Sequence, residues 1–393
     1  MRQVAAAAFA ASLLAAVAVP AATAEAATGG VTVTVVRSGL NAPRHLTLTG
    51  AGLFVAQAGA GGPVGTANCV TGPEIGGTAP TQYCVGLTGA VSLIRGGKIA
   101  ASVRLPSVIE EASQEVAGPG SVAFGRGVTA VTIQDVLVNS KGGNSLPKPL
   151  GSLFGRLLIQ SGRRVIAANL AAFAATHPQS AASLGTVPGE VAYDSDPYDV
   201  AAYRGGFVVT DAAANDLLQV SASGQIRLLA RFPAISQTVP TGVLGNPAPI
   251  TVQAQAVPTD IAVGPDGALY VSTLSGIPSD PGTARVYRVV PGHSPTVWAS
   301  GLTAVTAIAF DAQGRLLATE YSTGGLLAPM TVPGALVRIS SDGQTVTTLP
   351  VSGLFQPTGV AAGPGGAVYV SNYGYNTATN SHPGEILKIT GLS

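Results

Sequence analysis

A short phrase is repeated along this chain, and the repetition leaves few folds open to it. Residues 257–272 read VPTDIAVGPDGALYVS, and residues 357–371 read PTGVAAGPGGAVYVS. Each copy contains an apolar run, a turn with glycine and a second apolar run, which is the pattern of a β-hairpin. The alignment gives six copies, and their first strands begin at Leu46, Val122, Val200, Ile261, Ile308 and Val360.

Further strand patterns follow most copies, so each unit resembles a four-stranded antiparallel meander. Successive first strands lie 76, 78, 61, 47 and 52 residues apart, and spacings of about 45 to 50 residues are typical of propeller blades. The last copy is one strand short, whereas residues 31–38 form an unmatched strand before the first copy. We therefore predict an all-β, six-bladed β-propeller with four-stranded antiparallel blades, whose ring is closed by residues 31–38 completing the last blade.

The first 26 residues have the pattern of a secretory signal peptide. An apolar stretch at 4–19 follows a positive charge, and small residues permit cleavage after Ala24 or Ala26. An uncleaved membrane anchor is the alternative, because this stretch is only slightly shorter than a membrane span. We predict that residues 27–393 form a single propeller domain that is secreted, monomeric and free of any stable membrane span.

The two cysteines, Cys69 and Cys84, lie in a segment rich in glycine, proline and threonine. An exported protein folds in an oxidising compartment, where two such cysteines favour a disulfide. Two cysteines alone make a poor metal site, and they lack the C-x-x-C spacing of redox proteins. The sequence therefore predicts that a Cys69–Cys84 disulfide pins a long loop.

The charge pattern argues against two classes of partner. Lys plus Arg (20) nearly balance Asp plus Glu (19), only 10% of the residues are charged, and long basic runs are absent. Nucleic acid and anionic membrane surfaces are therefore not expected partners. The chain also lacks the nucleophile elbow G-x-S-x-G, the zinc motif H-E-x-x-H and the Walker phosphate loop. No catalytic residue can be named from such motifs.

Polar residues recur at the two strand ends that a hairpin places side by side. The start of the first strand and the end of the second meet at one end of each sheet, so these residues should surround the mouth of the central channel. The candidates for ligand binding are Arg44, His45, Gln57, Gln134, Asp199, Asp211, Asp260, Glu320 and Asn372. The alternative is that polar residues at strand ends meet water and have no further role.

Four of these candidates are carboxylates, the oxygen ligands that Ca²⁺ prefers. The possible metal ligands are Asp199, Asp211, Asp260 and Glu320. The neighbouring DSDPYD segment, with Asp194 and Asp196, is either part of such a site or a cluster of turns stabilised by aspartate side chains.

An ordered set of motifs gives the chain a family resemblance. The set includes GLNAPRHL, DSDPYDV, VVTDAAANDLLQVSASG and VPTDIAVGPDGALYVSTLSGIP, and it extends over roughly residues 31 to 390. It resembles the ScyD/ScyE family of exported β-propeller proteins, which implies the fold and export but no particular activity. More distantly, the chain is similar to NHL-repeat proteins and to the SMP-30/gluconolactonase enzymes, which implies a divalent cation at the channel mouth.

The match to those lactonases is incomplete at the motif that supplies metal ligands. Their PNG or PDG tripeptide corresponds here to PRH, PGS, PYD, PTD and PTG, so Asp199 and Asp260 stand one residue later than expected. Two hypotheses follow. The protein is an exported binding module for a small molecule, a glycan or a protein, or it is a cation-dependent hydrolase or lactonase that uses Ca²⁺.

Overall fold

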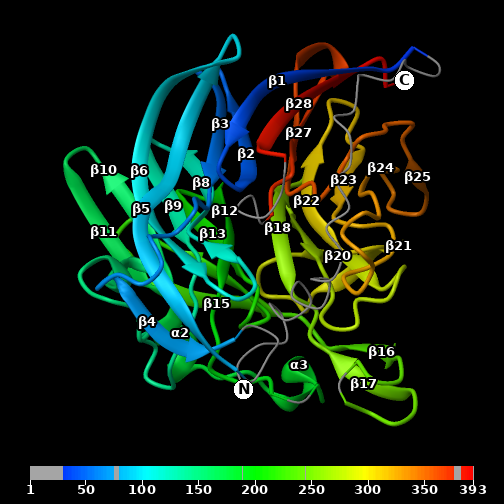
Figure 1. The fold of residues 1–393 in the computed structure, drawn as a ribbon. Coiled ribbons are helices and arrows are strands. Elements are labelled where there is room, and N and C mark those ends of the chain that lie inside the picture. The colour runs from blue at the N-terminus through cyan, green and yellow to red at the C-terminus, as the bar shows by residue number, and fades with distance from the viewer. Residues whose placement is uncertain (1–29, 75–78, 188, 244, 376–381, 393) are drawn as a thin grey trace.

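The computed structural model describes residues 30–74, 79–187, 189–243, 245–375 and 382–392. In these residues the strands form six antiparallel blades and one separate two-stranded sheet. Figure 1 shows the blades arranged as a ring. The predicted all-β, six-bladed propeller with four-stranded blades is confirmed. The predicted signal peptide, residues 1–26, lies outside the described residues.

Each blade runs from an inner strand beside the channel to an outer strand. Blade 1 consists of β2 (Pro43–Thr49), β3 (Gly52–Gln57), β5 (Pro80–Arg95) and β6 (Lys98–Glu110). Blade 2 consists of β8 (Pro119–Gly125), β9 (Val128–Ile133), β10 (Arg156–Ser161) and β11 (Arg164–Asn169). Blade 3 consists of β12 (Pro197–Tyr203), β13 (Gly206–Asp211), β14 (Asp216–Val220) and β15 (Ile226–Arg231). Blade 4 consists of β18 (Pro258–Val263), β19 (Leu269–Thr273), β20 (Ala284–Val289) and β21 (Thr296–Leu302). Blade 5 consists of β22 (Val305–Phe310), β23 (Leu316–Glu320), β24 (Ala335–Ile339) and β25 (Val346–Thr348). Blade 6 consists of β26 (Gly359–Ala362), β27 (Val368–Asn372), β28 (Gly384–Thr390) and β1 (Thr32–Leu40).

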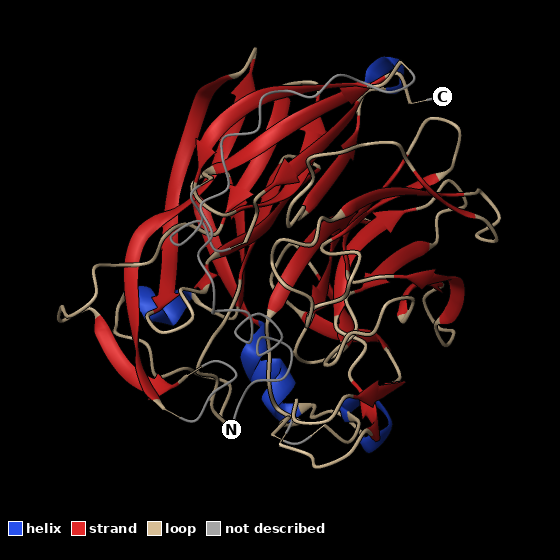
Figure 2. Ribbon diagram, turned by 45° about the vertical axis from the view of Figure 1, so that its right-hand side comes forward, coloured by secondary structure: helices blue, strands red, loops and turns tan. Residues whose placement is uncertain are grey.

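The remaining elements decorate this ring. They are β4 (Cys69–Pro73) and β7 (Val116–Ala117) beside blade 1, the hairpin of β16 (Ile235–Val239) and β17 (Ile250–Ala254), helices α2 (Leu170–Thr176) and α3 (Ala181–Leu184), and 3-10 turns at Leu150–Leu153 and Pro364–Gly366. Figure 2 shows that these short helices lie in connections outside the sheets. None of the helices in the described part of the chain has the length and apolar character of a membrane span.

The ring closes as the sequence predicts. Strand β1 pairs antiparallel with β28, with Thr32 opposite Thr390, so the two ends of the ring share blade 6. Each inner strand contacts the next, and β26 contacts β2. The core consists of apolar side chains between adjacent blades; for example, Tyr270 of blade 4 packs edge-on against Phe310 of blade 5, with ring centres 4.9 Å apart. Without β1, strand β28 would be an unpaired outer edge of blade 6, which is a hazard for aggregation.

Five of the six inner strands begin with an irregularity in register. The shift follows Pro43, Pro119, Pro197, Pro258 and Val305. Such a bulge places an extra residue on one strand and re-aims the side chains around it. Threonines in these segments also join the blades; for example, the Oγ1 of Thr306 donates to the carbonyl of Pro357 at 2.7 Å. The bulges therefore determine which side chains reach the channel.

The predicted disulfide is present, but its cysteines lie in strands. Cys69 of β4 stands directly opposite Cys84 of β5, and the two are bonded. The segment expected to be a loop instead adds a strand to blade 1, whose β5 and β6 extend beyond the usual blade length. The disulfide thus holds an extension of blade 1 together.

Removing this disulfide is expected to lower the free energy of unfolding by up to about 3 kcal/mol, because the bond closes a loop with a sequence separation of 15 residues in the unfolded chain. Urea unfolding of the Cys69→Ser, Cys84→Ser double variant measures the effect. Reduction of the wild-type protein should give the same shift. An unchanged midpoint in both would show that the extension is held by its strand pairing alone.

Candidate functional site

A cavity of about 140 Å³ lies where the inner strands begin, at one mouth of the channel. Residues from five inner strands or the segments just before them contribute to it: Arg44, Tyr198, Thr259, Thr306 and Thr358. Its walls come from the extension of blade 1, from residues 134–138 after β9, and from Tyr321 and Tyr375. The cavity is thus centred on the channel and enclosed by segments inserted between the repeated hairpins.

Arg44 is the residue of this cavity whose hydrogen bonding is least satisfied. Its side chain is only 2% exposed, and its Nη2 donates to the carbonyl of Val116 at 2.9 Å. The guanidinium also lies over the ring of Tyr375, 4.7 Å from the ring centre. Its Nε and Nη1 have no hydrogen-bond partner among the described residues. A permanently charged group with two unpartnered donors is unusual in a protein interior and needs an explanation.

Carboxyl groups line the cavity together with Arg44. Oε1 of Glu115 and Oδ2 of Asp135 are buried and have no partner within the described parts of the chain. Burial, reinforced by the charge of Glu110, raises the pKa of Glu115 well above its ordinary value. Burial also raises the pKa of Asp135, and burial with the charge of Asp211 raises the pKa of Asp196 to about 7. These carboxyl groups can hold protons near neutral pH, so they can donate hydrogen bonds as well as accept them.

The rest of the lining is largely aromatic and apolar. It includes Tyr83, Val116, Leu137, Tyr198, Val257, Leu274, Tyr321 and Tyr375. Burial raises the pKa of Tyr198 to about 12, so its phenol stays protonated. The β16–β17 hairpin supports this side of the cavity, since Val239 and Val252 belong to the same apolar cluster as Val257, Leu274 and Tyr321. An apolar body with a few polar groups is the usual composition of a small-molecule site.

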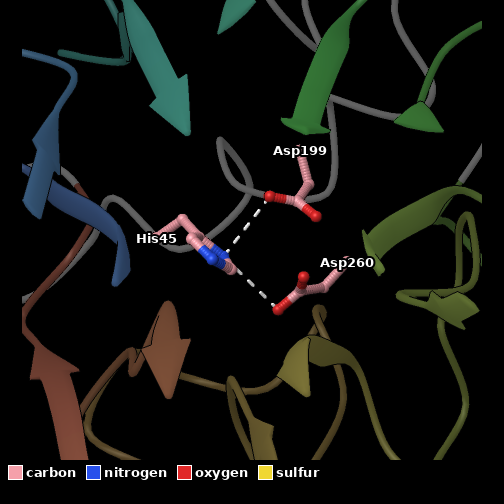
Figure 3. Close-up of side chains that lie close together, drawn as sticks. All are labelled: His45, Asp199 and Asp260. Atoms are coloured by element: carbon pink, nitrogen blue, oxygen red, sulfur yellow. Dashed lines mark ion pairs between the residues drawn. The ribbon is translucent and has the colours of Figure 1, made fainter. Parts of the chain in front are cut away.

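A second group lies one residue further along the inner strands. Nδ1 of His45 is 3.4 Å from Oδ1 of Asp199 and 3.5 Å from Oδ2 of Asp260, as Figure 3 shows. The two carboxylates are almost fully buried, and the side chain of His45 is 17% exposed. We call these three residues the channel cluster. None of the three lines the cavity, whereas the residue just before each of them does. Consecutive residues of the inner strands therefore form two layers, one at the cavity and one in the channel cluster.

The backbone of two blades orients the carboxylates of the channel cluster. The amide of Ile261 donates to Oδ2 of Asp199 at 3.0 Å and to Oδ1 of Asp260 at 2.6 Å. The amide of Ile308, in blade 5, donates to Oδ2 of Asp260 at 2.8 Å. Burial alone lowers the pKa of His45, but the charges of Asp199 and Asp260 outweigh it and raise that pKa to about 9.

The side chains of four predicted rim residues are hydrogen-bonded to loop backbone. Gln57, Asp211, Glu320 and Asn372 each accept a hydrogen bond from a main-chain amide just before an inner strand, at Asn41, Asp196, Thr303 and Phe355 respectively. None of the four lines the cavity. These residues recur at equivalent positions for a structural reason. The second strand of the blade ends there, so a side chain in place of the backbone accepts the hydrogen bond from the loop amide.

The predicted set of four metal ligands is therefore not assembled. Only Asp199 and Asp260 come together, and His45 joins them in place of Asp211 and Glu320. Within the described residues, this is the only group of three or more His, Cys, Asp or Glu side chains close enough to share an ion. Gln134 does line the cavity. However, β9 ends at Ile133, which is paired with Pro119, so Ile133 and not Gln134 occupies the position equivalent to the strand ends of the other blades.

Sequence reasoning missed Glu115, Asp135 and Tyr375 as residues of the site. All three lie outside the repeated hairpins, in segments where no register can be aligned. Asp194 and Asp196 fit either a turn cluster or a ligand set in the sequence, and both line the cavity. The signal that could have found Glu115 and Asp135 is the concentration of acidic side chains in the long insertions of blades 1 to 3.

The structure defines a class: a six-bladed β-propeller with a cavity at the mouth of its channel, one of whose lining residues is the buried Arg44. Comparison of the sequence with family models and with curated proteins finds no match to either. Membership of the ScyD/ScyE family is therefore not shown.

Solved structures of other propellers resemble the fold. Streptogramin B lyase is 12% identical, with 92% of this chain and 98% of that chain covered and a TM-score of 0.48. A Thermus oxidoreductase, provisionally assigned as a glucose dehydrogenase, is 16% identical. The match covers 92% of this chain and 100% of that chain, with a TM-score of 0.49. A provisionally assigned gluconolactonase is 11% identical, covers 92% of each chain, and has a TM-score of 0.46. Propellers of such low identity carry unrelated activities, so these similarities do not assign one.

Proposed function

We propose that this protein is an exported binding protein whose cavity takes a small organic molecule with a carboxylate or carbonyl group. The observation that carries the proposal is Arg44, a buried guanidinium in the cavity wall with two donors that lack partners in the described part of the chain. A carboxylate or carbonyl oxygen is the acceptor that such a charged donor binds most strongly. Bound there, it would satisfy groups that otherwise destabilise the folded state.

The size of the cavity limits the ligand. An engineered cavity of about 150 Å³ in another protein holds benzene, so about 140 Å³ corresponds to a small molecule built on about one ring. This supports a small molecule over a glycan chain or a protein segment. The aromatic and apolar lining suits a ring or a branched carbon skeleton, and the carboxyl groups of Glu115 and Asp135, whose pKa values are raised by burial, suit a hydroxyl substituent.

The geometry supports a cation-dependent hydrolase less well. Such an enzyme needs its metal ion in contact with the substrate, but the channel cluster does not line the cavity, and Asp211 and Glu320 accept hydrogen bonds from loop amides. Binding without turnover is the simpler use of this site.

Export is supported by the signal-peptide pattern of residues 1–26 and by the disulfide, which is typical of oxidising compartments. N-terminal sequencing of protein from the culture medium tests it. A first residue of Glu25 or Ala27 supports export, whereas an intact N-terminus in the membrane fraction contradicts it.

Sodium benzoate is expected to raise the melting temperature saturably, because its carboxylate can accept from Arg44 while its ring contacts the tyrosines. A ligand that binds only the folded state stabilises it by RT ln(1 + [L]/Kd), about 2.7 kcal/mol at a hundredfold excess over Kd. Benzyl alcohol has the same ring without the charge and is the matched control. Calorimetric titration should show one site per chain.

The panel should also contain acetate, butyrate and 4-hydroxybenzoate, which vary the size and the hydroxyl group. If no member binds with one-site stoichiometry, or if benzyl alcohol binds as tightly as benzoate, the proposal is wrong. This test measures binding alone. An assay that finds no hydrolase activity would therefore not change its outcome.

A further inference from the structure

We propose that the channel cluster binds a divalent transition-metal ion of the Zn²⁺ type, held by Nδ1 of His45, Oδ1 of Asp199 and Oδ2 of Asp260. The three ligands come from β2, β12 and β18, so the ion would link blades 1, 3 and 4 across the channel. The inference goes beyond the proposed ligand cavity and does not depend on it.

The distances in the cluster suit a shared ion better than a hydrogen-bonded histidine. His45 Nδ1 lies 3.4 and 3.5 Å from the two carboxylate oxygens, whereas charge-assisted N–H···O bonds measure about 2.7 to 2.9 Å. Ligands on a tetrahedral Zn²⁺ with bonds of about 2.0 to 2.1 Å stand about 3.3 Å from one another. The two separations from His45 are therefore close to the edges of such a tetrahedron, and all three ligand atoms lie within 4.8 Å of one another.

The hydrogen bonding points to the same place. Oδ1 of Asp199, the atom that faces His45, is buried and has no hydrogen-bond partner among the described residues. The other oxygen of this carboxylate accepts from the amide of Ile261, and both oxygens of Asp260 accept from backbone amides. Backbone donors behind the ligands fix their orientation, which is how metal sites hold their ligands in position.

The donor set selects the kind of ion. Ca²⁺ takes six to eight oxygen ligands, whereas Zn²⁺ and its neighbours accept one imidazole with carboxylates in a four-coordinate site. Two carboxylates and a neutral imidazole also balance the charge of a divalent ion, so the buried group would carry no net charge. Ser121 lies beside Asp199, close enough for its hydroxyl to influence that carboxylate. It or a water molecule would take the fourth position.

The experiment uses the full mature protein, freed of metal with EDTA and titrated with ZnCl₂. We expect one Zn²⁺ per chain by calorimetry and by elemental analysis, together with a rise in melting temperature. His45→Gln should weaken Zn²⁺ binding at least a hundredfold. His293→Gln, at an exposed histidine, is the matched control and should bind as the wild type does.

Co²⁺ provides a readout that needs no variant. Tetrahedral coordination with one nitrogen ligand should give a visible absorption band that ZnCl₂ displaces, and the band would be lost if His45→Gln removed the ligand. Three results would each overturn the proposal: no stoichiometric binding, equal Zn²⁺ affinity in wild type and His45→Gln, or stabilisation by Ca²⁺ without any by Zn²⁺. If benzoate fails to bind while Zn²⁺ binds as expected, the proposed function falls and this inference stands.

Discussion

Replacing Arg44 with methionine is expected to abolish benzoate binding while leaving the empty protein about as stable as the wild type. Removing one partner of a buried charge pair typically costs about 2 to 5 kcal/mol, so the affinity should fall at least about thirtyfold. Methionine has a similar shape, so the loss of affinity would not come from a collapsed wall. The affected interaction is the one between the ligand and the two guanidinium donors without partners among the described residues.

The stability of this variant separates a binding residue from a structural one. Arg44→Met loses one hydrogen bond to Val116 and the contact with the Tyr375 ring, which together contribute about 1 to 2 kcal/mol. It also removes a buried charge with unsatisfied donors, a change that is often neutral or stabilising. The two effects oppose each other, so we expect a net change within about 1 kcal/mol.

Calorimetric titration and urea unfolding of the same preparation measure both quantities. Arg44→Lys, which keeps the charge but loses the planar fork, should bind benzoate with intermediate affinity. Benzoate binding that survives Arg44→Met, or a loss of several kcal/mol in stability without any change in binding, would show that Arg44 serves the fold.

The protein is expected to be more stable at pH 5 than at pH 8. Burial raises the pKa of Glu190 to about 8, and burial with the charge of Asp211 raises that of Asp196 to about 7. Burial also raises the pKa values of Glu115, Asp135 and Asp216 well above their ordinary values. In the unfolded chain all five groups ionise near pH 4, so between about pH 4 and pH 8 the folded protein binds more protons than the unfolded chain does.

The sign follows from proton linkage. Where the folded state binds more protons, the free energy of unfolding falls as pH rises. The fall should begin above about pH 4 and continue through the folded pKa values near 7 and 8. All five groups shift in the same direction, so their contributions to this fall in stability add.

Urea unfolding at pH 5, 6, 7 and 8 measures this dependence. Glu190→Gln should make the decline less steep, because it removes one of the protons that the folded state retains. Glu111→Gln, at an exposed position after β6, should leave the decline unchanged. Stability that rises from pH 5 to pH 8 would contradict the expectation and would mean that these carboxyl groups are solvated in the folded protein.

The cavity contains both Arg44, which is expected to bind the ligand, and carboxyl groups whose burial is expected to make stability depend on pH. Glu115, Asp135, Asp196 and Arg44 all line it, and each is a polar group whose burial opposes folding unless it has a partner. A propeller ring with a large apolar core between its blades can tolerate such a region. Unfavourable polar burial that recurs at one concave site is the pattern expected of a binding site, where a ligand supplies the missing partners.

The fold was predictable because its determinants are local. A hairpin needs only alternating apolar residues around a glycine turn, as at 257–272, and each copy carries this information within about sixteen residues. Ring closure by β1 was also predictable, since an unmatched first strand and an incomplete last blade can satisfy each other. The Cys69–Cys84 pairing required no more than the number of cysteines and the expectation of export.

The composition of the site was decided by contacts that the repeat does not encode. Arg44 and His45 are neighbours in sequence, yet the bulge at the start of β2 brings one to the cavity and the other to the channel cluster. Asp211 and Glu320 stand at the predicted strand ends, but nearby loop amides donate hydrogen bonds to them. Glu115 and Asp135 come from insertions that only the closed ring brings together, because loop positions depend on packing between blades and not on a local pattern.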